Sequence, residues 1–229
     1  MIVWTEFASP AADAAWRRQG SHHDLIERIS TAHGFANKAA CPWLKLAIFG
    51  DKRSPKGSLR HDANVLRITG IEADYDGEQV QPGEAVEMLE RAQLKAIVYT
   101  SPSHKPDRPR WRVLAPCSEG LDPAVRPALV ARLNGVLGGI LAPESFTTSQ
   151  AYYFGAVDGA PDYRVQVTFD DIEEGRCIDQ LDELDDIAIG KPAAEPKTDR
   201  GDEGATVSAD ARMVSELRSA LNALDADER

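Results

Sequence analysis

The segment 70–77, with the sequence GIEADYDG, constrains the fold of this chain more than any other. Side chains alternate between the two faces of a β-strand, so a strand here has one apolar face and one acidic face. The apolar face carries Ile71, Ala73 and Tyr75, and the acidic face carries Glu72, Asp74 and Asp76. We therefore predict a strand over residues 67–75 that buries one side in a core and presents carboxylates on the other.

Two aspartates at this spacing on one strand face suit divalent metal ions. The Cα atoms of Asp74 and Asp76 are expected about 6.5–7 Å apart, and side chains leaning together from there can reach a metal pair about 3.5–4 Å apart. Like charges so placed repel each other unless a cation lies between them. Oxygen ligands favour Mg²⁺ or Mn²⁺ over zinc. An isolated Asp-x-Asp is more often the exposed face of an edge strand, or a strand end entering a turn.

The rest of the first 170 residues mixes helix-like and strand-like patterns. Helices are predicted at 82–91 and 125–141, each with a proline suited to its first turn. Strands are predicted at 94–100, 110–116, 151–157 and 163–169. Because neighbouring strands follow one another like hairpins, this order predicts an α+β fold with an antiparallel or mixed sheet flanked by helices, rather than a parallel doubly wound sheet.

Acidic residues concentrate at the C-terminal end. The formal net charge is −11, and residues 171–229 carry 17 acidic and 7 basic side chains, so residues 1–170 are close to neutral. Residues 190–206 have the composition of a linker, and apolar residues recur at helical spacing within residues 207–229. We predict a core domain over residues 1–189, followed by an acidic flexible extension that consists of the linker and an amphipathic helix.

Membrane attachment is not expected from this sequence. No stretch approaches about 18 consecutive apolar residues, and the N-terminus lacks the basic-then-apolar order of a secretory signal. Cys41, Cys117 and Cys177 are widely spaced and form no CxxC motif. We expect a protein of the reducing cytoplasm, with no membrane partner, whose thiols fill the core.

The loop after the predicted strand 94–100 gathers side chains suited to phosphate. Ser103 and His104 lie in this loop, and Arg110 and Arg112 share one face of the next predicted strand. Hydroxyl, imidazole and guanidinium donors match phosphate oxygens, so a nucleoside triphosphate is the expected ligand. Taken singly, the histidine is more simply an exposed loop residue and the arginines a solvated face. Their combination beside an acidic strand favours the nucleotide.

A second basic loop, residues 51–61, precedes the acidic strand. Its Arg53, Lys56 and Arg60 are suited to following the backbone of a single-stranded DNA template. The same composition is typical of an ordinary charged surface loop, which the pattern alone favours slightly.

Together these motifs resemble the archaeo-eukaryotic primase superfamily, in particular the primase-polymerase domains of phages, prophages and plasmids. The resemblance covers residues 53–169 and depends on the DYD at the strand end, the YTS strand, the loop with Ser103 and His104, and the RWRVLAP strand. It implies an RRM-like antiparallel sheet flanked by helices. It also implies metal-dependent synthesis of primers or DNA from nucleoside triphosphates on single-stranded DNA.

The resemblance further implies roles for individual residues. Asp74 and Asp76 match the metal-binding carboxylates of the first motif, and His104 matches the histidine of the second motif, which contacts the phosphates of the incoming nucleotide. These three residues form the implied catalytic set. The implied nucleotide-binding set is Ser103, His104, Arg110 and Arg112.

The third motif departs from its usual form. Relatives place another aspartate there, often in the phrase Asp-Pro-Ala-Ser, whereas this chain has Ala142 in the phrase Ala-Pro-Glu-Ser. Glu144 is the nearest replacement as the third metal ligand, and Asp158 is a second. Without a third ligand one metal site is weakened, and polymerase activity is feeble or absent.

Three functions are compatible with these residues. We expect a primase or polymerase that replicates a mobile element by two-metal nucleotidyl transfer with Mg²⁺ or Mn²⁺, with a replicative helicase as a possible partner. The second is a replication-initiation module that keeps the fold and binds DNA without catalysis. The third is a two-metal nuclease, because the same carboxylates and metals cleave phosphodiesters.

Overall fold

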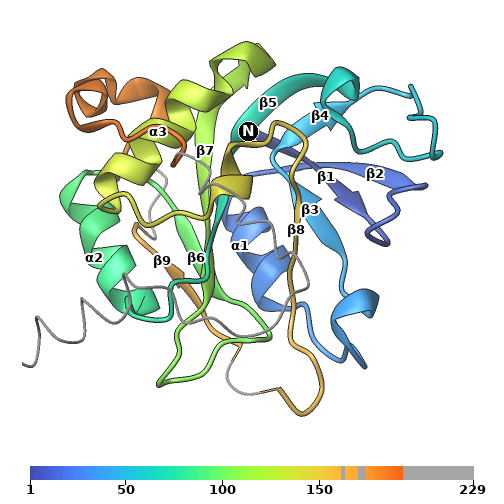
Figure 1. The fold of residues 1–229 in the computed structure, drawn as a ribbon, viewed down its shortest axis with the longest axis horizontal. Coiled ribbons are helices and arrows are strands. Elements are labelled where there is room, and N and C mark those ends of the chain that lie inside the picture. Colours follow the sequence, from blue (N-terminus) through green and yellow to red (C-terminus); the bar gives the residue numbers. More distant parts are fainter. Residues whose placement is uncertain (161–162, 170–173, 193–229) are drawn as a thin grey trace, which may run out of the picture. The chain divides into compact units, whose positions relative to one another are not determined.

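The computed structural model describes residues 1–160, 163–169 and 174–192, and the pairing between its strands is antiparallel in both of two sheets (Figure 1). The larger sheet has the order β4-β5-β7-β6-β9, with strands Ala47–Phe49, Val65–Tyr75, Trp111–Leu121, Ile97–Thr100 and Val165–Val167. The smaller sheet has the order β2-β1-β3-β8, with strands Ala15–Gly20, Ile2–Phe7, Trp43–Lys45 and Tyr152–Tyr153. The fold is therefore of the predicted α+β class.

The register of β5, β7 and β6 brings two loops together at one end of these central strands of the larger sheet. Asp74 pairs with Arg112 and Tyr75 with Trp111 across β5 and β7, and Thr100 of β6 pairs with the same Trp111. The chain therefore leaves β5 and β6, and enters β7, at the same level. The loops that follow Tyr75 and Thr100 start side by side.

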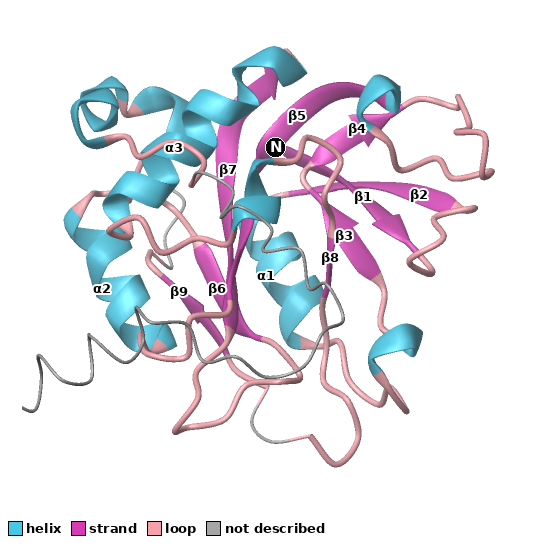
Figure 2. Cartoon of the chain, viewed as in Figure 1, coloured by secondary structure: helices cyan, strands magenta, loops and turns pink. Residues whose placement is uncertain are grey.

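Different helices cover the two faces of the larger sheet (Figure 2). The helices are α1, His22–Ser30, α2, Pro82–Arg91, and α3, Arg126–Val136. α2 and α3 pack in one apolar cluster with Ile71, Ala73 and Tyr75 of β5, whereas α1 packs in a second cluster with residues of β6 and β7. Glu72 and Asp74 point away from the first cluster, which confirms the predicted alternation of β5. Short 3-10 segments complete the described part: Lys38–Ala40 (η1), Asp62–Asn64 (η2), Pro123–Val125 (η3), Pro143–Phe146 (η4), Ile178–Gln180 (η5) and Asp182–Ile187 (η6).

Local sequence signals explain where the helices begin and end. Ser21 caps α1: its Oγ accepts a hydrogen bond from the Asp24 N–H at 3.1 Å, and the Asp24 carboxylate accepts one from the Ser21 N–H at 2.7 Å. α3 stops at Val136, earlier than predicted. Gly138 and Gly139 follow with φ of +73° and +84°, a left-handed conformation that ends a helix and favours glycine.

The N-terminal strands β1 to β4 were not predicted from the sequence. β2 is an edge strand of the smaller sheet whose four central residues are exposed, so its sequence AWRRQG shows no apolar alternation. β3 and β4 have three residues each, and β8 has two, where a longer strand over 151–157 was expected. Strands this short carry too few residues for a periodicity.

Residues 182–189 lie against α3. Arg132 of α3 pairs with Asp182 at 2.9 Å and with Asp185 at 2.6 Å, and a side chain at Gly135 would collide with the backbone of Ile187. The predicted flexible extension, with its linker 190–206 and its helix 207–229, lies outside the described residues from position 193 onward. None of the helices in the described part of the chain has the length and apolar character that crossing a bilayer requires.

Candidate metal and nucleotide site

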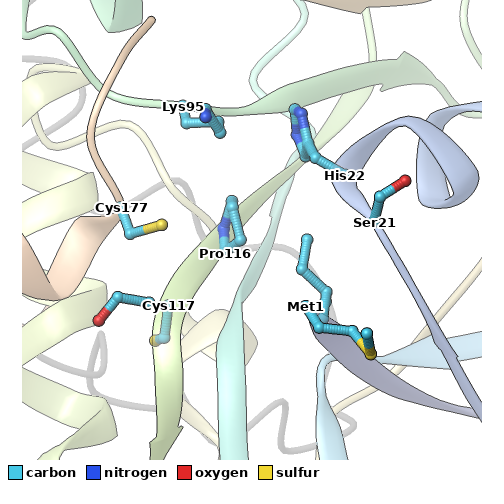
Figure 3. Close-up of a pocket in the computed structure, with 9 residues that line it drawn as sticks. Met1, Ser21, His22, Lys95, Pro116, Cys117 and Cys177 are labelled. Carbon is cyan, nitrogen blue, oxygen red and sulfur yellow. The ribbon is translucent and has the colours of Figure 1, made fainter. Parts of the chain in front are cut away.

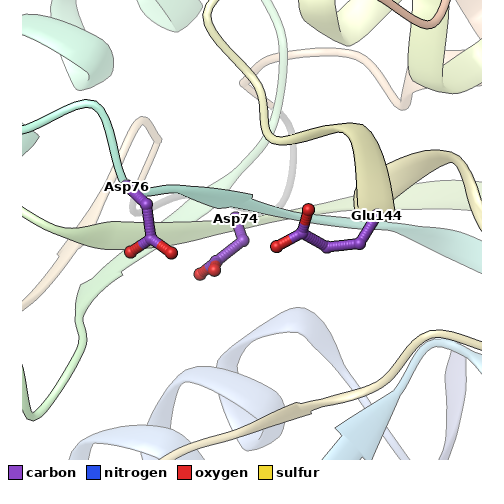
Figure 4. A group of neighbouring side chains, drawn as sticks. All are labelled: Asp74, Asp76 and Glu144. Atoms are coloured by element: carbon purple, nitrogen blue, oxygen red, sulfur yellow. The ribbon is translucent and has the colours of Figure 1, made fainter. Parts of the chain in front are cut away.

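Three carboxylates from two distant segments meet beside the end of β5. Asp74 lies in β5, Asp76 is the first residue after the end of β5, and Glu144 lies in η4. One carboxylate oxygen of each residue lies within 4.8 Å of those of the other two. Figure 4 shows the Asp74 carboxylate between those of Asp76 and Glu144. Asp74 is buried, whereas Asp76 and Glu144 are exposed. Of the two candidates for a third ligand, the fold brings Glu144 to the aspartates, while the exposed Asp158 is not in the cluster.

Hydrogen bonds hold η4 against β5. The Ala142 N–H donates to the Asp74 carbonyl oxygen at 2.9 Å, and the Asp74 N–H donates to the Ser145 Oγ at 3.1 Å. The guanidinium of Arg126, at the start of α3, donates to the Ser145 carbonyl oxygen at 2.6 Å. These bonds flank Glu144 in the chain, so its position relative to Asp74 is determined by backbone contacts.

Arg112 is paired with Asp74, the buried member of the three carboxylates. Its Nε donates to an Asp74 carboxylate oxygen at 2.7 Å, its Nη1 donates to the Tyr153 carbonyl oxygen at 2.6 Å, and its guanidinium stacks 4.0 Å from the centre of the Tyr153 ring. Both Asp74 and Arg112 are buried. Burial raises the pKa of Asp74, and the guanidinium of Arg112 opposes that shift. Arg112 therefore lies on the same side of the sheet as Asp74 and is paired with it. Its predicted role in nucleotide binding stays a prediction.

The three carboxylates fit a hard divalent cation. Oxygen ligands lie about 2.0–2.1 Å from Mg²⁺ and about 2.3–2.6 Å from larger cations, so opposite ligands of one ion are about 4–5 Å apart. The observed limit of 4.8 Å falls in this range. Asp74, Asp76 and Glu144 would hold the ion, and the donor set, which contains oxygen alone, suits Mg²⁺ or Mn²⁺.

Glu72 does not join this cluster, although the sequence places it on the same strand face. Its side chain is fully buried and forms ion pairs with Lys45 of β3 and with Arg126, the latter at 2.9 Å. Burial, with the charge of Arg126 acting in the same direction, lowers the pKa of Lys45 to about 7, and Glu72 opposes the shift. The carboxylate thus links β3, β5 and α3 underneath the site.

A small cationic cavity lies at the same end of strands β5 and β7. Its volume is about 180 Å³, and it is lined by Glu78, Ser103, Lys105, Arg108 and Arg110. Arg110 also approaches the Asp76 carboxylate at 3.5 Å, so the cavity adjoins the carboxylate cluster. Hydrogen bonds from Arg108 and Arg110 lower the pKa of Glu78, which is therefore charged. Lys105, Arg108 and Glu78 were not among the residues predicted from the sequence to bind nucleotide.

The predicted loop residues lie beside this cavity. The Arg110 N–H donates to the His104 Nδ1 at 3.2 Å, and His104 is buried. Ser103 lines the cavity and its Oγ accepts a hydrogen bond from the Lys38 ammonium. The structure thus brings the predicted nucleotide-binding residues Ser103, His104 and Arg110 together, and their role stays a prediction.

The second basic loop makes contacts within the chain. The Arg53 guanidinium donates to the carbonyl oxygens of Asp13 and Gly57 at 3.1 and 2.7 Å, and that of Arg60 donates to the Pro10 carbonyl oxygen at 3.2 Å. Lys56 is exposed. Arg53 and Arg60 therefore stabilise the conformation of the loop, and template binding by Arg53, Lys56 and Arg60 remains a prediction.

Another cavity, of about 320 Å³, shares no lining residue with the carboxylate cluster. His22, Lys95, Cys117 and Cys177 are among the residues that line it (Figure 3). His22 is 9% exposed, and its Nε2 has no hydrogen-bond partner among the described residues. Burial lowers the pKa of His22 to about 4, with a smaller contribution from the charge of Lys95.

Comparisons with known proteins give little further information. No family model matches the chain, and no curated protein matches it in sequence. Among solved structures, the AEP domain of the Cyanophage S-2L primase-polymerase (PrimPol) matches with a TM-score of 0.43 and 11% sequence identity. The match covers 80% of this chain and 88% of that chain. Because this similarity is low, we infer the chemistry of the site only from the side chains described above.

Proposed function

We propose that the chain is a metal-dependent nucleotidyltransferase, a primase or polymerase that builds strands from nucleoside triphosphates on single-stranded DNA. One observation carries this proposal: the three carboxylates of Asp74, Asp76 and Glu144 meet beside a cavity lined by cations. The first group suits divalent ions and the second suits phosphates. The resemblance of the motifs to primase-polymerase domains agrees with both halves of the site.

Each group of residues then has a distinct task. The carboxylates of Asp74, Asp76 and Glu144 would hold the divalent ion, which would lower the pKa of a 3′-hydroxyl and neutralise charge on the triphosphate. Arg110, with the Ser103 hydroxyl and His104, binds and orients the phosphates and offsets the charge that develops on them. Arg112 holds the buried Asp74 carboxylate in one orientation, because it is tied to both Asp74 and the Tyr153 carbonyl oxygen.

One observation favours a second candidate, a DNA-binding module of the same fold without catalysis. Asp74 is already paired with Arg112, and Asp76 and Glu78 are both close to Arg110. Much of the negative charge is therefore balanced by cations of the chain itself, which weakens the demand for a metal ion.

Incorporation of labelled nucleotides tests the proposal. The full chain is mixed with a primed or unprimed single-stranded DNA template, labelled nucleotides and Mn²⁺, and the variant Asp76→Asn is run beside Asp158→Asn. Asp76 is in the cluster and Asp158 is not, and both are exposed. We expect extension by the wild type and by Asp158→Asn, and none by Asp76→Asn or in EDTA.

The same reactions distinguish the other functions. DNA binding that persists in EDTA, with no labelled product under any condition, supports the binding module. Shortening of a labelled strand without added nucleotides supports a nuclease. Equal extension by the wild type and Asp76→Asn refutes the assignment of this site.

A further inference from the structure

Glu78 is held in an unusual backbone conformation immediately after the acidic strand. Its φ is +58°, in the left-handed region that residues other than glycine rarely adopt. The Tyr75 hydroxyl accepts hydrogen bonds from the N–H groups of Gln79 and Val80 at 3.0 and 2.9 Å, which fixes the turn. A side chain at Gly77 would lie 2.7 Å from the Tyr75 ring, so this turn also requires glycine there. The turn aims the Glu78 carboxylate at the cationic cavity.

The carboxylate of Glu78 engages two arginines at once. Arg108 binds it in a bidentate manner, with Nε–Oε2 and Nη2–Oε1 distances of 2.7 and 3.0 Å. Arg110 places Nε and Nη2 at 2.9 and 2.5 Å from the same Oε1. Guanidinium groups bind carboxylate and phosphate oxygens with the same forked geometry. Glu78 therefore fills the positions that phosphate oxygens would take.

The lining of the cavity carries more positive than negative charge: Glu78 is its one carboxylate, and Asp76 lies 3.5 Å from Arg110 at its margin. Lys105, Arg108 and Arg110 line it together with Glu78, and Lys38 contacts the Ser103 hydroxyl at its wall. An anion that carries several charges and many acceptor oxygens can replace one carboxylate on both arginines and also reach the lysines.

We propose that Glu78 is a competitor built into the site: it occupies Arg108 and Arg110 until the β- and γ-phosphates of a nucleotide displace it. This inference deepens the proposed function and rests on it for the identity of the nucleotide. A ligand can bind these arginines only when Glu78 has left them. The apparent affinity of the ligand is therefore its intrinsic affinity multiplied by the fraction of molecules in which Glu78 has left the arginines. Glu78 thereby selects for polyphosphates, because a ligand with a single phosphate does not replace all of the lost contacts.

Binding of inorganic tripolyphosphate in EDTA tests this proposal without the metal site. Titration calorimetry compares the wild-type full chain with Glu78→Gln, which keeps the shape of the side chain and removes its charge. Glu87→Gln is the matched control, because Glu87 forms an exposed ion pair with Arg91 on α2 and does not line the cavity. We expect about tenfold tighter binding by Glu78→Gln, the size of effect that two partly exposed ion pairs supply. Glu87→Gln should bind as the wild type does.

A second variant separates release of the arginines from a change in the turn. Adding Arg108→Gln to Glu78→Gln should remove most of the gained affinity, because the arginine that Glu78 had released is then absent. Unchanged or weaker tripolyphosphate binding by Glu78→Gln overturns the inference, as does a gain that survives Arg108→Gln. The binding assay contains no nucleotide and no metal, so it is independent of the extension assay. If Glu78→Gln binds tripolyphosphate more tightly but the wild-type chain does not extend DNA, the role of Glu78 is supported and only the proposed polymerase activity is refuted.

Discussion

The pair Asp74 and Arg112 predicts that the two aspartates of the proposed metal site contribute differently to the stability of the fold. Asp74→Asn removes the charge of a buried carboxylate 2.7 Å from a buried guanidinium. Breaking a buried ion pair by removing one partner costs about 3–5 kcal/mol. Asparagine retains one oxygen that accepts from Arg112, so we expect the lower end, about 3 kcal/mol. Asp74→Asn should therefore lose both metal binding and a large part of the free energy of unfolding.

Asp76→Asn is the matched comparison, since the same chemical change occurs two residues away. The Asp76 side chain is 47% exposed and lies 3.5 Å from Arg110. Exposed ion pairs contribute about 0–1 kcal/mol, and removing this charge also relieves repulsion from Asp74 and Glu144. The free energy of unfolding should change by less than about 1 kcal/mol, while metal binding is lost as in Asp74→Asn.

Urea unfolding with and without Mn²⁺ measures both effects. A ligand that binds only the folded state at 100 times its dissociation constant stabilises it by about 2.7 kcal/mol. We expect this gain in the wild type and in neither variant. If Asp74→Asn and Asp76→Asn are equally stable without metal, the buried pair does not support the fold as argued. If either variant keeps the full Mn²⁺ gain, the metal assignment is wrong.

Three further predictions concern residues around the site. Glu144→Gln should weaken Mn²⁺ binding about tenfold or more, because it removes one charged ligand, while Asp158→Asn leaves it unchanged in a titration followed by electron paramagnetic resonance. Arg126→Met should lower the free energy of unfolding, measured in urea, by about 3–5 kcal/mol, because it leaves the buried Glu72 carboxylate with one partner fewer. Arg91→Met, on the surface of α2, should change the free energy of unfolding by no more than about 0.5 kcal/mol. Similar values for both variants would contradict the buried network. His22, whose pKa of about 4 lies below its ordinary 6.5, predicts stability that falls as the pH drops from 6.5 to 4, since only the unfolded chain takes up the proton. The loss is up to about 3 kcal/mol, and a pH series of urea curves in which His22→Gln keeps the same slope would refute this explanation.

The central strand could be predicted because its alternation is long enough to read. β5 has eleven residues, and the apolar set Ile71, Ala73 and Tyr75 determines which way Asp74 points. The same alternation placed Arg110 and Arg112 on one face of the next long strand, but the pairing of that strand with β5, which brings Arg112 to Asp74, was not predicted. By contrast, the short strands of the N-terminal sheet left no period of two in the sequence.

Partners from distant parts of the chain explain what the sequence could not reveal. Glu72 lies two residues before Asp74, just as Asp74 lies two residues before Asp76, yet Glu72 forms ion pairs with Lys45 and Arg126 instead. No local sequence pattern identifies Lys45 and Arg126 as its partners. Glu144 was the first candidate for the third ligand and Asp158 the second, and hydrogen bonds between η4 and β5 hold Glu144 beside Asp74. Glu78 was missed because its contacts with Arg108 and Arg110 depend on a left-handed turn that no sequence motif predicts.

The most direct test of the central claim is anomalous diffraction from crystals grown with Mn²⁺ and a non-hydrolysable nucleoside triphosphate. We expect a manganese peak within about 2.0–2.6 Å of oxygens from Asp74, Asp76 and Glu144, with the terminal phosphates on Arg110. Manganese elsewhere, or a bound nucleotide whose phosphates lie away from these carboxylates, would contradict the account.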